Sequence, residues 1–319
     1  MSEPWVDPET IAAGAELKRR DLVAPPGASI DVMRATQLRA SAFLNEGSVP
    51  LARERDVVAP GPGGPIPCRL YLPDQATGAA PPALLVYAHG GSFIIGRARG
   101  WDGMLRALVR ASGVAAMSVD YRLAPEHKFP AGFDDMLAVV RHVARDGAAL
   151  GIDPTRLAAG GDSAGANLAL GAALALRDAG ETALRFLMLV YGVYSTDGDS
   201  ASWRQLGTGA YGLSQAGIAW LWETYLATPD QRGDWRAAPL LADLRGLPPA
   251  HLLISTLDPL LDDNHHLAQR LAAAGVPHQL ETYEGVQHGF IRYGRLIKTA
   301  ARAVQDCGAA LRAALGPPA

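Results

Sequence analysis

Cysteine is scarce in this sequence, with two residues among 319, Cys68 and Cys307. The two lie far apart along the chain and near no cluster of histidines. They therefore fit buried free thiols better than a disulfide or a metal site. Because free thiols are typical of a reducing compartment, we expect a cytoplasmic protein without a bound metal.

Long apolar runs, basic clusters and targeting signals are also missing. No apolar run reaches the ~18 residues of a transmembrane helix, and the first residues lack the basic and apolar regions of a signal peptide. The net charge is −3 and no Lys/Arg cluster stands out, which argues against nucleic acid and anionic membranes as partners. The sequence therefore predicts neither nucleic-acid binding nor membrane insertion.

Apolar residues are plentiful, at 49% of the chain, and their pattern alternates between strands and helices. A hairpin with strands at 52–59 and 66–72 is predicted first, because the glycine-rich segment 61–64 marks a turn. The alternation that follows predicts a mainly parallel sheet with helices on both faces. The predicted strands are 83–88, 114–119, 156–160, 186–191, 251–255 and 279–283, and the helices 131–146, 166–176, 262–275 and 294–315.

Two segments stand outside this alternation. Residues 8–23 and 31–46 predict helices with too few apolar residues for a core of their own. Residues 192–248 separate two core strands, hold four of the six tryptophans and include a helix-like stretch at 214–227. Such an insertion is typical of a lid. The alternative is a structural insertion that does not contact the substrate. We expect N-terminal cap helices (1–48), a first core part (49–191), the cap or lid insertion (192–248) and a second core part (249–319).

A glycine-flanked serine lies at the centre of the predicted sheet, in the segment Gly161-Asp162-Ser163-Ala164-Gly165. A strand is predicted before this G-x-S-x-G segment and a helix after it, the context in which such a serine is a nucleophile. The flanking glycines remove Cβ atoms that would clash in so tight a bend. The pattern predicts Ser163 as a nucleophile; a small-residue turn with an incidental serine is the alternative.

A serine nucleophile needs a base and an acid that orients the base. His288 follows the last predicted strand, and Asp258 follows the strand at 251–255. Because parallel strands share one carboxyl edge, both loops open where Ser163 lies. We predict His288 as the base and Asp258 as the acid, with Asp262 capping the next helix. The alternatives are a surface role for His288 and a capping role for Asp258.

Hydrogen-bond donors for a developing oxyanion are expected on the loop after strand 83–88, where His89 begins a glycine-containing run. Glycines let backbone N–H groups approach a substrate oxygen, and His89 is expected to brace the loop. The predicted oxyanion hole consists of the N–H groups of Gly90, Gly91 and Ala164. The predicted substrate contacts are Ser92, Phe93 and Asp162.

These segments together resemble the hormone-sensitive lipase family, the bacterial family IV esterases of the α/β-hydrolase superfamily. The resemblance covers about residues 50–319 and implies an α/β-hydrolase fold with an eight-stranded, mostly parallel sheet and a helical cap. It also implies the triad Ser163, Asp258 and His288. Ser92 stands where the family usually has a third glycine, which puts the preferred substrate shape in doubt. The matching segments are His89-Gly90-Gly91, Tyr121–Glu126, Gly161–Gly165, Asp258–Asp262 and His288-Gly289-Phe290.

The resemblance implies a serine carboxylesterase that cleaves short- to medium-chain esters through an acyl-enzyme, without a metal or organic cofactor. The implied partner is a small-molecule ester. Family members often dimerise through the sheet edge, so a homodimer is an option that no residue here demands. A lactonase, an amidase or a lipase could use the same triad. Hydrolase-like gibberellin receptors bind ligands without the histidine base, so His288 argues against a non-catalytic protein.

Overall fold

The structure, a computed structural model, describes residues 4–74 and 80–316. An eight-stranded sheet runs through it in the order β1-β2-β4-β3-β5-β6-β7-β8. The first two strands form the predicted antiparallel hairpin, β2 pairs antiparallel with β4, and the other neighbours pair in parallel. The predicted mostly parallel sheet is therefore confirmed. Its strands are β1 (Arg53–Ala59), β2 (Ile66–Leu72), β3 (Leu84–Ala88), β4 (Ala115–Val119), β5 (Leu157–Asp162), β6 (Leu184–Val190), β7 (Ala250–Leu257) and β8 (His278–Gln287).

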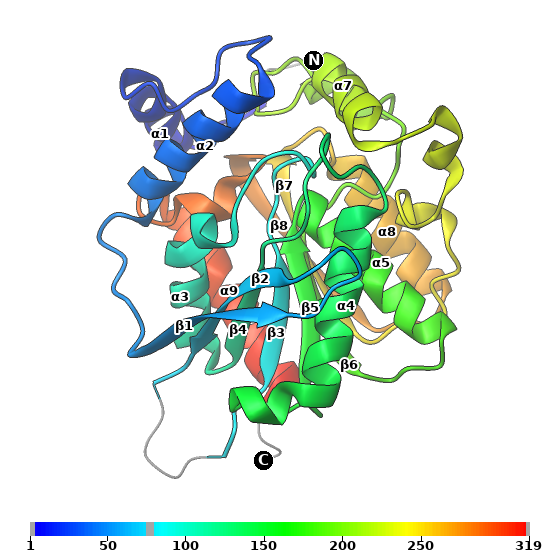
Figure 1. The fold of residues 1–319 in the computed structure, drawn as a ribbon. Coiled ribbons are helices and arrows are strands. Elements are labelled where there is room, and N and C mark those ends of the chain that lie inside the picture. Colours follow the sequence, from blue (N-terminus) through cyan, green and yellow to red (C-terminus); the bar gives the residue numbers. More distant parts are fainter. Residues whose placement is uncertain (1–3, 75–79, 317–319) are drawn as a thin grey trace.

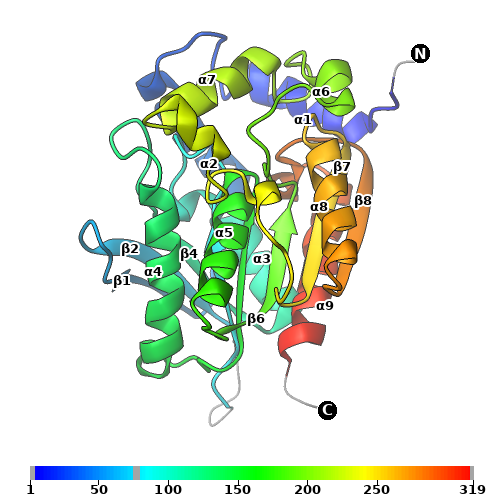
Figure 2. The same cartoon turned by 90° about the vertical axis from the view of Figure 1, so that its right-hand side faces the viewer.

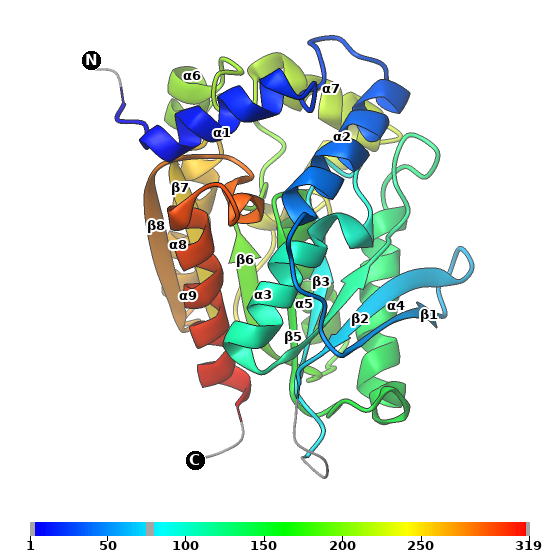
Figure 3. The same cartoon turned by 90° about the vertical axis from the view of Figure 1, so that its left-hand side faces the viewer.

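Helices cover both faces of this sheet (Figures 1 and 3). One face carries α3 (Asp102–Ser112) and α9 (Lys298–Leu315), and the apolar side chains of these helices pack on the sheet. The other face carries α4 (Ala131–Asp146), α5 (Ala164–Asp178) and α8 (Leu261–Ala273). Every residue of β3 and β5 is buried because both strands lie between two helical layers.

The remaining α-helices gather over one end of the sheet (Figure 2). They are α1 (Pro8–Arg19) and α2 (Ile30–Asn45) from the N-terminal segment, and α6 (Ala201–Leu206) and α7 (Gln215–Tyr225) from the insertion. Short 3₁₀ turns complete the fold at η1 (Ala98–Trp101), η2 (Gly147–Leu150), η3 (Pro229–Gly233), η4 (Pro239–Leu241) and η5 (Phe290–Tyr293). Of the expected domain ranges, residues 1–3, 75–79 and 317–319 lie outside the described part.

Two helices were not predicted from the sequence, α3 and the short α6. Four apolar residues of α3, at 104, 105, 108 and 109, are buried on one side of the helix, and this spacing is a helical signal. Glycines at 100 and 103 interrupt the pattern at its start and hide that signal. The last helix begins at Lys298 rather than 294, because residues 294–296 form a turn between η5 and the helix. None of the helices in the described part combines the length and apolar composition needed to cross a bilayer.

Candidate active site

Ser163 lies at the corner between β5 and α5, as the sequence predicted. Its backbone has φ 56° and ψ −119°, a conformation that L-residues with a side chain rarely adopt. The strain is concentrated at the tip, since β5 and α5 on either side hold the turn in place. This turn lifts the serine hydroxyl out of the sheet layer and leaves its Oγ within reach of the loops at the strand ends.

The two glycines of the turn allow a very close approach to the neighbouring strand. A Cβ atom added to Gly165 would lie 1.9 Å from the carbonyl oxygen of Ala88, and one added to Gly161 would lie 2.4 Å from the same oxygen. Both distances are far below van der Waals contact, and the atom in the way is backbone. The corner can therefore form only with glycine at these positions.

We expect Gly165→Ala to destabilise the protein by more than about 4 kcal/mol, because the backbone of β3 or α5 must move to admit the methyl group. Urea unfolding followed by circular dichroism measures this free energy. Gly233→Ala is the matched control, since no atom lies within 4 Å of its added Cβ. A Gly165→Ala protein as stable as the Gly233→Ala protein would contradict the close approach.

His288 joins the serine to an aspartate. Its Nε2 lies 2.9 Å from Ser163 Oγ, and its Nδ1 lies 2.7 Å from Asp258 Oδ2. An ionised carboxylate can only accept, so Nδ1 carries the proton and Nε2 is free to accept from the hydroxyl. His288 comes from the loop after β8, and Asp258 from the loop after β7. The structure thus brings together the three residues that the sequence placed at one edge.

Asp258 is held for this contact by its own loop. The carboxylate is 1% exposed, and its second oxygen accepts the N–H of Leu260 at 2.9 Å. One oxygen therefore fixes the turn into α8 while the other orients the imidazole. Asp258 does not cap α8, however, because the N-cap residue is Leu260 and no side-chain bond caps this helix.

Tyr191 packs against the imidazole of His288 and was not predicted from the sequence. Its fully buried ring lies 4.8 Å from the ring of His288 and 5.9 Å from that of Phe290. The residue follows β6 directly and has φ 36°, so the backbone turns sharply there. An aromatic residue at the end of a core strand was the available signal, but it does not reveal which side chain it supports.

The first turn of α8 anchors the start of the insertion. Asp262 Oδ2 accepts the N–H of Ser202 at 2.8 Å, and Asp263 Oδ2 accepts the N–H groups of Tyr194 at 3.2 Å and Ser195 at 3.1 Å. The predicted cap role of Asp262 is wrong, because α8 begins after Leu260 without a side-chain cap. Its carboxylate instead bonds to a distant segment, a contact that local spacing does not reveal.

Asp263 predicts a pH dependence of stability. Burial raises the pKa of this carboxyl to about 7, further raised by Asp258 and Asp197, although the N–H groups of Tyr194 and Ser195 oppose the shift. Between the ordinary pKa and about 7, the unfolded chain has released this proton while the folded chain keeps it. The contribution of Asp263 to stability is therefore lost as the pH rises through this window.

We expect Asp263→Asn to stabilise the protein by roughly 1–3 kcal/mol at pH 8, because the amide oxygen still accepts and carries no charge. The gain should shrink as the pH falls towards the ordinary pKa of 3.8, because the unfolded chain then begins to bind this proton as well. Urea unfolding of both proteins from pH 4 to pH 8 measures it. A gain that is equal at pH 4 and pH 8 would contradict the shifted pKa.

The loop after β3, residues 89–95, is called the oxyanion loop after its predicted role. It is fixed by buried side chains. Asp162 Oδ1 accepts the N–H of Gly90 at 2.8 Å and the hydroxyl of Tyr87 at 2.7 Å. Tyr121 donates its hydroxyl to the carbonyl of His89 at 2.7 Å, and the His89 Nδ1 lies 2.8 Å from the carbonyl of Gly90. Since a carbonyl only accepts, this Nδ1 carries the proton. Two successive peptide groups of the loop are thus held, the first by Asp162 of β5 and Tyr121 after β4, and the second by the ring of His89.

These contacts change the expected roles of two residues. The N–H of Gly90, predicted as an oxyanion donor, already donates to Asp162. Asp162, predicted as a substrate contact, is only 3% exposed, and its carboxylate is used in this bond. Within residues 4–74 and 80–316, the N–H groups of Gly91, Ser92 and Ala164 have no such acceptor. On this loop, the N–H groups without an acceptor are therefore those of Gly91 and Ser92, one residue further along than the predicted pair Gly90 and Gly91.

Phe93 links this loop to the insertion. Its backbone has φ 60°, and its ring stacks on that of Tyr225 in α7 at a centroid distance of 4.0 Å and an angle of 7°. The ring is 1% exposed. The insertion also approaches His288 through Gly212, because a Cβ atom added to this glycine would lie 3.8 Å from the Cβ of His288. The insertion therefore touches both the oxyanion loop and the histidine loop.

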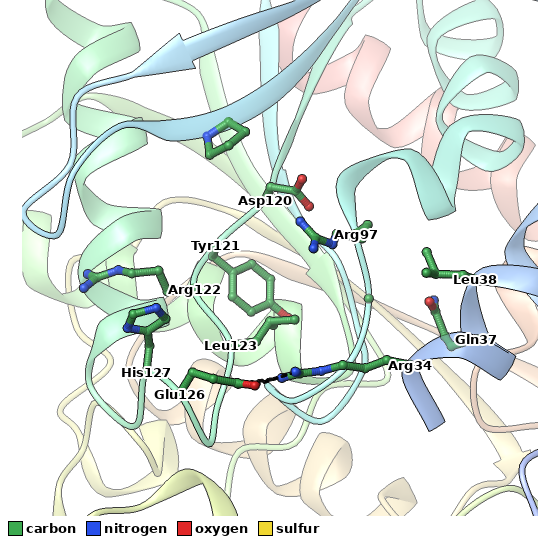
Figure 4. A pocket seen from close by; sticks show the side chains of 12 residues that line it. Arg34, Gln37, Leu38, Arg97, Asp120, Tyr121, Arg122, Leu123, Glu126 and His127 are labelled. Atoms are coloured by element: carbon green, nitrogen blue, oxygen red, sulfur yellow. Dashed lines mark hydrogen bonds and ion pairs between the residues drawn. The ribbon is translucent and has the colours of Figure 1, made fainter. Parts of the chain in front are cut away.

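A separate pocket of about 380 Å³ lies behind the oxyanion loop, beside α2 (Figure 4). Arg34 of α2 forms an ion pair with Glu126, with Nη1 and Oε1 2.7 Å apart, and donates to the carbonyls of Ile94 at 3.0 Å and Ala124 at 2.9 Å. Ser163, Asp258 and His288 are not among the residues that line this pocket. Arg34 thus ties the N-terminal helix to the oxyanion loop and to the segment after β4.

Among the described residues, the other histidines and acidic side chains form no comparable centre. His142 pairs with Asp146 on α4, and His251 is buried in β7. In the part of the chain that the structure describes, no group of three or more His, Cys, Asp or Glu side chains is placed to hold a metal ion.

Comparison with known proteins places this architecture in a family. A family model described as the alpha/beta hydrolase fold matches residues 85–292. The chain is 37% identical over 240 residues to an ethyl acetate hydrolase of Pseudomonas putida, covering 75% of each protein. It is 32% identical over 287 residues to an acetyl esterase of Salmonella paratyphi B, covering 88% of this chain and 86% of that protein.

A solved structure shares the fold over nearly its whole length. It is a hyperthermophilic esterase from the archaeon Pyrobaculum calidifontis, with a TM-score of 0.91 and 32% identity, covering 97% of this chain and 98% of that one. Since these relatives cover most of the chain and are named as ester-cleaving enzymes, this chain belongs to the α/β-hydrolase fold family, in its hormone-sensitive lipase branch, and it is a carboxylic ester hydrolase.

Proposed function

We propose that this esterase works through Ser163, His288 and Asp258 and forms an acyl-enzyme on the serine. The single observation that carries the proposal is the chain of contacts from Asp258 Oδ2 to His288 at 2.7 Å and on to Ser163 Oγ at 2.9 Å. His288 Nε2 takes the hydroxyl proton as Oγ attacks the ester carbonyl carbon. Asp258 keeps the imidazole in the tautomer that this transfer needs and stabilises the imidazolium.

The remaining steps follow from the same three groups. The imidazolium returns its proton to the leaving alkoxide as the C–O bond breaks, which leaves the acyl group on Oγ. Water then attacks the acyl carbon while His288 accepts its proton, and Oγ leaves with that proton as the acid product forms. The enzyme returns to its starting state, and each proton is accounted for by His288.

We place the oxyanion hole at the N–H groups of Gly91, Ser92 and Ala164. The support for this choice is that these N–H groups have no acceptor in the described part of the chain, whereas the Gly90 N–H is bound to Asp162. A serine in place of a third glycine loses no backbone donor, because the donor is the N–H. Loss of one donor in such a site typically costs about 10²–10³ in kcat.

We further propose that α1, α2 and residues 192–248 form a cap that limits the acyl chain to short and medium lengths. The contacts of the insertion with Phe93 and with His288 support it, and two relatives are named for acetyl and ethyl acetate substrates. A closed cap of this kind suits dissolved esters better than an oil interface.

A chain-length series of p-nitrophenyl esters tests this proposal. We expect kcat/KM to peak between acyl chains of about C2 and C8, because longer chains must displace the cap. Matched anilides and lactones are the controls, and both should react much more slowly than the ester of the same acyl group. A maximum at C12 or longer with faster turnover in emulsion would indicate a lipase, and an anilide rate equal to the ester rate would indicate an amidase.

A further inference from the structure

Arg292 is a residue that the proposed mechanism does not use directly, and it connects three parts of the molecule. It lies in η5, on the same loop as His288. Its Nη2 donates to Ser41 Oγ of α2 at 2.7 Å and to the carbonyl of Gly100 in η1 at 3.1 Å. The side chain therefore joins the histidine loop, the N-terminal cap helix and the segment that follows the oxyanion loop.

The guanidinium also ends a column of aromatic rings. Its central carbon lies 4.0 Å from the ring centroid of Trp101. The Trp101 ring stacks on that of His89 at 4.9 Å, and the other side of His89 faces Tyr121 at 4.4 Å. All three rings are at most 3% exposed. A cation over a desolvated tryptophan face is strongly attracted, so Arg292 presses the column together from one end.

The position of the His89 ring determines where an oxyanion donor points. Its Nδ1–H binds the carbonyl of Gly90, and that carbonyl belongs to the same planar peptide group as the N–H of Gly91. If the ring moves, the plane turns and the Gly91 N–H turns with it. A shift at Arg292 is thus transmitted through Trp101 and His89 to a proposed donor of the oxyanion hole.

The positive charge of Arg292 also affects the pKa values of His89 and Asp162, the two side chains that bind Gly90. Burial lowers the pKa of His89, and the nearby guanidinium lowers it further against the opposing bond to the Gly90 carbonyl. Burial raises the pKa of Asp162, whereas the Tyr87 hydroxyl and the cation of Arg292 oppose that rise. The ionised form of Asp162 is the better acceptor for the Gly90 N–H, so the cation of Arg292 favours the form that holds this peptide group.

We propose that Arg292 is a positioning residue for the oxyanion hole, which acts by clamping the column of Trp101, His89 and Tyr121 behind the loop. The inference rests on the proposed function, because it concerns the same oxyanion donors. Arg292 does not touch the substrate. Its effect should therefore appear where the oxyanion is stabilised and leave the binding of the neutral ester largely unchanged.

Arg292→Met tests this role, with Arg295→Met as the matched control. Arg295 also reaches α2, where it lies 4.6 Å from the Phe43 ring and pairs with Glu46, but it has no contact with the column. We expect Arg292→Met to lower kcat about tenfold, a fraction of the cost of losing a whole donor, with KM nearly unchanged. Arg295→Met should keep kcat near wild type, even where it lowers the melting temperature.

Inhibition by n-butylboronic acid supplies a second readout, because its serine adduct is tetrahedral and directs an oxygen at the oxyanion donors. Measured well below the melting temperature of each protein, the Ki for Arg292→Met should rise by about the same factor as kcat falls. A Ki and a kcat equal to those of Arg295→Met would overturn the role of Arg292. Full activity in Ser163→Ala would instead overturn the proposed function itself, so the two failures are distinguishable.

Discussion

Replacing Ser163 with alanine is expected to lower kcat for p-nitrophenyl acetate by about 10⁶-fold, because the attacking oxygen is removed while the imidazole and the oxyanion donors remain. The loss should match that of His288→Ala and exceed that of Asp258→Asn. Rates of nitrophenolate release at saturating substrate measure it. Since alanine only shortens the side chain, the melting temperature should stay close to that of the wild type.

Residual hydrolysis in this variant is also informative. The oxyanion donors and the bound geometry alone typically leave about 10³–10⁴-fold acceleration over water. A rate within tenfold of the wild type, in a preparation free of contaminating esterase, would mean that Ser163 is not the nucleophile. Combining Ser163→Ala with His288→Ala should cost little more than Ser163→Ala alone, because the groups act as one unit.

Asp258→Asn is expected to lower kcat by about 10⁴-fold, because an amide in place of the carboxylate favours the imidazole tautomer with its proton on Nε2. That proton faces Ser163 Oγ and prevents the nitrogen from accepting the hydroxyl proton. The asparagine side chain has the same size, so the packing of the buried site is kept. Initial rates from pH 6 to pH 9 measure the loss.

Asp262→Asn is the matched control for this change, since its carboxylate accepts the Ser202 N–H and does not contact His288. The amide oxygen can accept the same bond, so kcat should stay within a few fold of the wild type. Equal losses in the two variants would show that the effect comes from the loop and not from the contact with the imidazole.

Much of the site could be predicted because it depends on the order of elements along the chain. Parallel strands place their following loops at one edge, so Ser163, Asp258 and His288 met as expected once the strands were identified. The alternation of apolar runs was strong enough to give the sheet. The glycines at 161 and 165 signalled a tight corner, and the structure shows the backbone oxygen of Ala88 that requires them.

The missed features depend on contacts between distant segments. Nothing in the sequence around Gly90 or Asp162 indicates that one binds the other, so local patterns predict Gly90 as a free donor and Asp162 as a substrate contact. The contacts of Tyr191 with His288 and of Arg292 with Trp101 are likewise invisible to local patterns. The homodimer and the cytoplasmic location stay predictions.

The most direct test of the central claim is covalent labelling with a p-nitrophenyl alkylphosphonate, followed by mass spectrometry of the digested protein. The account predicts one phosphonyl group per chain, on the peptide that contains Ser163, with activity lost in proportion to the label. Asp258→Asn should slow this labelling in step with its loss of kcat. A label on another residue, or full activity in a protein completely labelled at Ser163, would contradict the account.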